Sequence, residues 1–91
     1  MSESPRGGDL RLSIPADAAF VPVAADVAAR FAEYSGAAAS VAAEFGKAVA
    51  RLASGMPGRT IDFAMEPRAG VLTVRAQSGA SSQQTSCPLP E

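Results

Sequence analysis

Few side chains in this 91-residue sequence could do chemistry, and composition alone excludes several reaction classes. The sequence contains no histidine, which removes Ser-His-Asp and Cys-His nucleophilic catalysis together with the commonest zinc sites. Its single cysteine, Cys87, cannot form a disulfide within one chain, and no helix N-terminus or basic cluster adjoins it in the sequence. The glycines lack the spacing of a P-loop. We therefore expect Cys87 to be a passive thiol.

The charged side chains that could form a site lie on one segment of helical periodicity, residues 38–54. Glu44, Lys47 and Arg51 fall on one stripe of this helix. Glu44 has the functional group of a general base, and Lys47 with Arg51 would suit an acidic partner. Charges on a polar helix face are usually solvated surface, and this is the interpretation we favour for all three residues.

The apolar stripe beside these charges predicts that the helix packs on a core, through Val41, Phe45, Ala48, Val49 and Leu52. Gly46 lies inside the helix, where glycine costs about 1 kcal/mol relative to alanine. We interpret Gly46 as a tolerated residue in preference to a point of close backbone approach. Gly55 and Pro57 are expected to end the helix and turn the chain.

An earlier helix is predicted from five large side chains on one face: Phe20, Val23, Val27, Phe31 and Tyr34. Its start falls either after Asp17, a good N-cap, or close to Pro22, which suits the first helical position and is the start we favour. Asp26 and Arg30 are spaced for an i,i+4 ion pair, and Gly36 is a natural C-terminal stop.

Three segments alternate apolar and polar residues with period two, which predicts half-buried strands. Their inward residues are Leu10, Leu12 and Ile14 in the first, Ile61, Phe63 and Met65 in the second, and Leu72, Val74 and Ala76 in the third. The last two segments are joined by residues 67–70, Pro-Arg-Ala-Gly, a connection short enough for an antiparallel hairpin.

The remaining residues are predicted to be tails, 1–8 at the N-terminus and 80–91 at the C-terminus, which leaves one domain over residues 9–79. From Gln77 onward the sequence has no period and almost no bulk, which is typical of disorder. Ser81, Ser82 and Ser86 would then be modifiable hydroxyls in a polar spacer. The order β-α-α-β-β predicts an α/β (α+β) two-layer sandwich, with two helices on one face of a three-stranded sheet.

Composition narrows the classes of partner. The formal net charge is −1 with acids and bases interspersed, so no footprint for nucleic acid is visible. No apolar run approaches the roughly 20 residues of a membrane span, and the first residues lack a secretory-signal pattern. Because a single cysteine allows no disulfide framework, a reducing cytoplasm is the expected location. Hydrophobic residues make up 47% of the chain, but 20 of them are alanine, which brings little area to bury. A core this thin favours self-association.

The strand ending in Ile14-Pro15, the two helices and the hairpin that ends near Gly79 together resemble the anti-sigma-factor serine kinases. These enzymes belong to the histidine-kinase-like (GHKL, or Bergerat) ATPases. The similarity covers roughly residues 9–79, including LRLSIPADAAF and IDFAMEPRAGVLTVRAQSG, and rests on element order and spacing more than on signature residues.

The resemblance implies three nucleotide-contacting positions, and this sequence departs from the family at each. The family's central helix carries a Glu, matched by Glu44, and four residues later an Asn that helps to hold the metal, where this chain has Ala48. The family's second hairpin strand leads to an Asp-x-Gly; here Gly79 is present without the carboxylate. The lid and later elements of the family are replaced by the Ser/Gln-rich segment. Glu44, Ala48 and Gly79 are thus relic positions, and we expect no bound cofactor or metal.

The resemblance implies a degenerate ATPase-like scaffold without catalysis, acting by protein–protein contact in bacterial partner-switching regulation. Family members pair as dimers and hold sigma factors or antagonist proteins, so a homodimer is the expected assembly. Its contact surface would be an exposed sheet edge or the apolar surface near Phe63, Met65 and Leu72 that the missing elements leave uncovered. Two alternatives remain: a residual ATP-binding serine kinase or ATPase whose pocket a partner completes, and an unrelated small α/β dimer.

Overall fold

The computed structural model describes residues 9–89. The tail predicted for residues 1–8 and the last two residues of the predicted C-terminal tail lie outside these described residues. In chain order the elements are β1 (Leu10–Pro15), a short 3₁₀ helix η1 (Ala18–Phe20), α1 (Val21–Tyr34), α2 (Ala39–Ser54), β2 (Thr60–Arg68), β3 (Val71–Ser78) and β4 (Ser81–Pro88).

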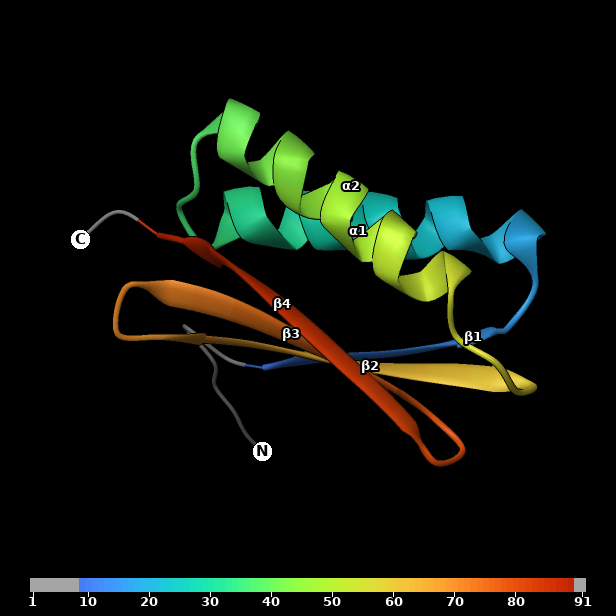
Figure 1. Cartoon of the computed structure of the whole chain (residues 1–91). Coiled ribbons are helices and arrows are strands. Elements are labelled where there is room, and N and C mark those ends of the chain that lie inside the picture. The colour runs from blue at the N-terminus through green and yellow to red at the C-terminus, as the bar shows by residue number, and fades with distance from the viewer. Residues whose placement is uncertain (1–8, 90–91) are drawn as a thin grey trace, which may run out of the picture.

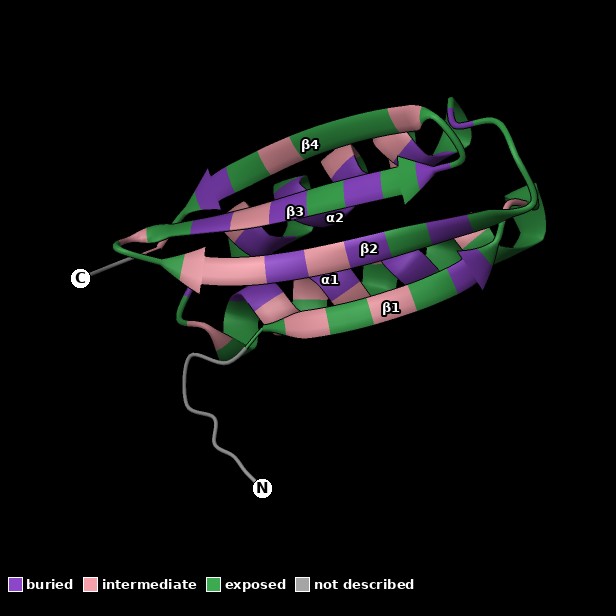
Figure 2. Cartoon of the chain, turned by 90° about the horizontal axis from the view of Figure 1, so that it is seen from below, coloured by how far each residue is buried: buried purple, intermediate pink, exposed green. Residues whose placement is uncertain are grey.

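The elements form two layers, with both helices on one face of an antiparallel sheet (Figure 1). The strand order is β1-β2-β3-β4, so each strand pairs with its neighbour in the list and β1 and β4 are the two edges (Figure 2). The predicted class, an α+β sandwich with helices on one face, is confirmed. The predicted number of strands is wrong, because the sheet has four strands and not three.

The fourth strand corrects the prediction of a disordered segment from residue 80. β4 pairs with β3 without a break, from Ser81 opposite Ser78 to Pro88 opposite Val71. A two-residue turn joins them, and Gly79 has φ +58°, the conformation needed at the first central position of a type II′ hairpin turn. Backbone hydrogen bonds to β3 hold this strand, so it forms without the alternating apolar side chains that reveal a strand in a sequence.

In β2 and β3 the residues predicted from their alternation are buried, whereas in β1 Ile14 is buried and Leu10 and Leu12 are half-buried against the core. Ile61, Phe63, Met65, Leu72 and Val74 are each at most 2% exposed beneath the helices. The expectation of an uncovered apolar sheet surface near Phe63, Met65 and Leu72 is therefore wrong. The two helices cover the centre of the sheet, and β4 forms the edge next to β3.

The buried face of α1 differs in part from the predicted one, because Val27 and Phe31 are half-buried against the core but the other three predicted residues are exposed. Its buried residues are Ala24, Ala28 and Ala32, whereas Phe20 and Val23 are exposed and Tyr34 is 77% exposed. Small side chains let a helix approach its neighbours closely, so the alanines form the buried contact in place of Phe20, Val23 and Tyr34. Both candidate starts are used, because Asp17 caps η1 through the amide of Ala19 and α1 then begins at Val21 with proline in its first turn.

The close approach of α1 and α2 depends on Gly46. A Cβ atom at this position would lie 3.0 Å from the carbonyl oxygen of Ala25 and 3.2 Å from the Cβ of Ala29. The interpretation of Gly46 as merely tolerated is wrong, since the space beside it is filled by the backbone of α1. On the sheet side, α2 buries Phe45 and Val49, as its apolar stripe predicts.

Candidate functional site

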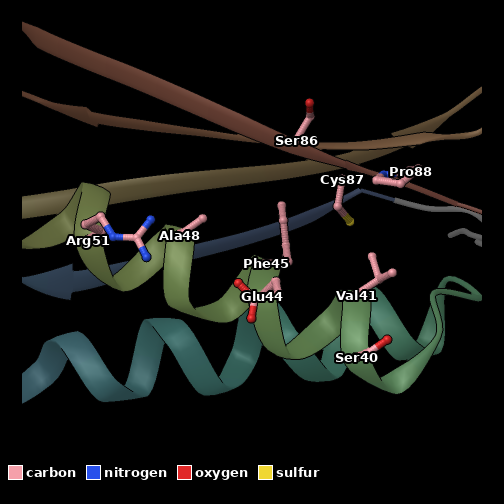
Figure 3. Close-up of a pocket in the computed structure, with 9 residues that line it drawn as sticks. All are labelled: Ser40, Val41, Glu44, Phe45, Ala48, Arg51, Ser86, Cys87 and Pro88. Atoms are coloured by element: carbon pink, nitrogen blue, oxygen red, sulfur yellow. The ribbon is translucent and has the colours of Figure 1, made fainter.

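A groove of about 480 Å³ lies between α2 and β4, which run antiparallel to each other at one side of the molecule (Figures 1 and 3). Its lining combines one flank of the helix with the last residues of the strand: Ser40, Val41, Glu44, Phe45, Ala48 and Arg51 from α2, and Ser86, Cys87 and Pro88 from β4. The volume is within the range of about 300–1,000 Å³ found for ligand pockets. The groove is wide open to solvent, however, unlike most small-molecule pockets.

Helical periodicity places the α2 residues on this flank. Positions 41, 44, 48 and 51 recur every three or four residues and therefore share one side of the helix. Period-two alternation does the same on β4, where the Cys87 sulfur points toward α2 and the Ser86 hydroxyl points away from it (Figure 3). The groove thus has an apolar floor and a polar rim.

The rim carries one acid and one base, two helical turns apart. The Glu44 carboxylate lies 3.7 Å from the Lys47 ammonium, but the two side chains are 74% and 67% exposed. An ion pair in this setting contributes about 0–1 kcal/mol. Arg51 lies further along the same flank and, among the described residues, forms no ion pair within 4.0 Å. Both Glu44 and Arg51 therefore remain accessible to a partner.

Cys87 is the most enclosed side chain that β4 contributes to the groove, being 6% exposed. Burial raises the pKa of this thiol above its ordinary value of 9.0, because a thiolate would lose hydration there. The protonated thiol is a poor nucleophile and a small apolar side chain. Cys87 therefore packs against α2 from within a strand, in contrast to its predicted place in a disordered tail.

The structure brings together two of the three relic positions. Glu44 and Ala48 both line the groove, as their four-residue spacing on one helix requires. Gly79 is not part of the groove and lies in the turn that begins β4, and a Cβ atom added there would meet nothing within 4 Å. No close backbone approach explains this glycine; its positive φ does.

The donor groups of the groove do not suit a magnesium–nucleotide complex. Mg²⁺ prefers several hard oxygen ligands, and the groove offers the single carboxylate of Glu44 beside the methyl group of Ala48 and the thiol of Cys87. Within residues 9–89 no group of three or more histidine, cysteine or acidic side chains is placed to hold a metal ion.

A second hollow, of about 410 Å³, lies on the outer face of the sheet, away from the helices. Ala64 is at its centre, between Arg11 on β1 and Arg75 on β3, and Asp62 and Glu66 flank it along β2. The Ser13 hydroxyl donates a 2.5 Å hydrogen bond to Asp62. The predicted alternation contains the signal for this hollow, because the polar residues of each strand must share one face. Its two acids and two bases balance, so it has no preference for one sign of charge.

Within residues 9–89, neither α1 nor α2 has the length and apolar character of a membrane-spanning helix. Comparison of the chain with protein-family models, curated proteins and solved structures found no match. The class of protein is therefore defined by the fold and the groove alone. The protein is a small two-layer α+β domain with an open groove beside an edge strand.

Proposed function

We propose that this protein is a non-catalytic, GHKL-like protein-binding module that acts as a homodimer in bacterial regulation of the anti-sigma or partner-switching type. The observation that carries the proposal is the groove beside β4. It holds Glu44 at the position where the resemblance places a catalytic carboxylate, yet its other surfaces are mainly apolar: Val41, Phe45 and Ala48. These surfaces favour contact with a protein over contact with a charged nucleotide.

Two features of the groove support a protein partner. An apolar centre with a polar rim is the usual anatomy of a protein interface. The adjoining edge strand β4 adds unpaired backbone groups, to which a strand of another chain, including that of a second copy, can bind by strand addition. A sigma factor or an antagonist protein is the partner that the resemblance implies.

The proposal predicts that ATP with Mg²⁺ leaves the melting temperature unchanged. A ligand that binds only the native state stabilises it, by about 2.7 kcal/mol at a concentration of one hundred times its dissociation constant. Differential scanning fluorimetry at millimolar ATP, with Mg²⁺ alone as the control, is the direct measurement. A dose-dependent rise in melting temperature would contradict the proposal. Affinity capture from the source organism, followed by mass spectrometry, then identifies the protein partner.

A second candidate function is favoured by the size of the groove and by Glu44 within it. In this alternative the chain is a residual ATP-binding serine kinase or ATPase, and a partner protein supplies the missing metal and adenine contacts. It predicts a nucleotide-dependent rise in melting temperature only when the captured partner is present. The same scan with and without that partner distinguishes the two functions.

A further inference from the structure

β4 is an edge strand without the features that usually prevent edge-to-edge pairing. Natural sheets protect their edges with charged side chains, prolines, bulges or very short strands. β1, the opposite edge, is six residues long, carries Arg11 and ends at Pro15. β4 is eight residues long, has no charged side chain, pairs without a bulge and has no proline before Pro88. The two edges therefore differ in their readiness to accept another strand.

The backbone groups of β4 that face outward can be assigned from the hairpin. Ser78 and Ser81 flank a two-residue turn and so direct their backbone groups at each other. Past the other end of the strand, the amide of Leu89 donates a 2.8 Å hydrogen bond to the Gly70 carbonyl. The contacts at both ends of the strand show that the backbone N–H and C=O groups of the odd-numbered residues of β4 point toward β3. The amide and carbonyl groups of Ser82, Gln84 and Ser86 therefore point to the free edge.

We propose that two copies of the chain pair antiparallel through β4, with the two-fold axis at Gln84, to form one continuous eight-stranded sheet. This inference rests on the homodimer of the proposed function and assigns its interface. In this register Gln84 pairs with Gln84 of the second copy, and Ser82 pairs with Ser86. All the outward groups of the three residues are then used, in about six hydrogen bonds.

The charges beside the edge fit the same symmetry. A two-fold axis perpendicular to the sheet keeps both helical layers on one side, so the two α2 helices approach each other antiparallel. Glu44 and Arg51 lie on the flank of α2 that faces this edge (Figure 3). Because the two α2 helices run antiparallel in this dimer, Glu44 of each copy faces Arg51 of the other. The groove flank is thus complementary to itself, which favours a second copy over an unrelated strand as the occupant.

Three variants at Gln84 test this interface. Gln84→Pro removes an outward N–H while leaving the hydrogen bonds to β3, because proline is tolerated where the amide of an edge strand faces solvent. Gln84→Glu gains Arg75 as a cross-strand neighbour within its own chain but places two glutamates side by side at the axis. Gln84→Ala keeps the backbone groups and is the matched control.

Light scattering and sedimentation across micromolar to millimolar concentrations give the readout. We expect wild type and Gln84→Ala to have twice the chain mass, and Gln84→Pro and Gln84→Glu to weaken the dimer by at least about tenfold, with high salt partly restoring the glutamate variant. Circular dichroism confirms that each variant is folded. Amide exchange of Ser82, Gln84 and Ser86 should slow as wild-type concentration rises.

Two results would overturn the inference, and they are distinguishable. If wild type is a dimer and both Gln84→Pro and Gln84→Glu remain equally dimeric, the β4 interface is wrong, while the homodimer of the proposed function stands. If wild type is a monomer at millimolar concentration, the homodimer and its interface both fail, and only the protein-binding part of the proposed function remains.

Discussion

Gly46 is the residue at which a single added side chain has the largest predictable effect on the helical layer. Valine there must displace the Ala25 carbonyl or the Ala29 side chain, which would lie 3.0 and 3.2 Å from its Cβ atom. The carbonyl belongs to the interior of α1 and cannot move by itself. We expect Gly46→Val to lower the free energy of unfolding by about 1–3 kcal/mol, as overpacking does.

The matched control for this variant is Ala43→Val, at an exposed position of the same helix. It carries the same β-branched side chain without the contact to α1, so its cost should be no more than about 0.7 kcal/mol, from helix propensity. Urea denaturation of both proteins gives the comparison. Equal losses in the two variants would show that α1 yields to a side chain at position 46.

The Cys87 thiol sets a pH dependence of stability at the residue scale. Its pKa in the folded chain is raised above the ordinary 9.0 by burial, so the folded state favours the protonated form. The resulting stability is fully present below pH 9.0 and is lost as pH rises through the folded-state pKa. We expect the urea midpoint to fall between pH 8 and pH 10 in wild type. Cys87→Ala should lack this component of the fall; an identical pH profile in the variant would contradict the assignment.

The burial of individual residues could be predicted where large side chains form the buried face, but not where alanines form it. Phe45 and Val49 are the bulky residues of their stripe and are buried as predicted. On α1 the alanines are as numerous as the large apolar residues and occupy several faces, so their periodicity does not single out one face. The face that is buried carries Ala24, Ala28 and Ala32. Its burial follows from the close approach of α2, which is a contact between residues distant in sequence.

At the scale of elements, the direction of each amide in β4 gives a test by proline substitution. The Thr85 amide faces β3 in the register that pairs Thr85 with Val74, whereas the Gln84 amide faces the free edge. Thr85→Pro should lower the free energy of unfolding by about 1–3 kcal/mol, because it removes a ladder hydrogen bond and leaves its β3 partner group unsatisfied. Gln84→Pro should cost much less. Comparable losses measured by thermal denaturation of the two variants would contradict this register.

The strands show which elements a sequence can reveal. β1, β2 and β3 were predicted because each alternates apolar and polar residues over a buried face. β4 was not, because Cys87 is its one buried residue and the rest of the strand is held by backbone pairing to β3. A signal was nevertheless present, since Gly79 followed by one residue between two extended segments is the pattern of a type II′ hairpin.

At the scale of the whole molecule, the groove was predictable only in part. Glu44 and Ala48 share a helix face, so their proximity follows from spacing alone. The wall opposite them comes from residues 86–88, some forty positions later in the chain, and depends on the path that β4 takes back along α2. For the same reason Gly79, which the resemblance places near Glu44, lies instead at the turn before β4.

In the proposed dimer, Glu44 and Arg51 carry charges that meet only between two copies. If Glu44 faces Arg51 across the two-fold axis, Glu44→Arg alone or Arg51→Glu alone places like charges opposite each other twice per dimer. An exposed pair contributes about 0.2–1 kcal/mol, so each single reversal should weaken the dimer by about 0.5–2 kcal/mol. The double variant Glu44→Arg with Arg51→Glu restores the opposite charges and should recover most of the loss, more completely at low salt. Glu33→Arg, which makes the same change at an exposed position of α1, is the control and should leave the dimer unchanged. Sedimentation equilibrium measures all five proteins, and additive losses in the double variant would mean that the two flanks do not face each other.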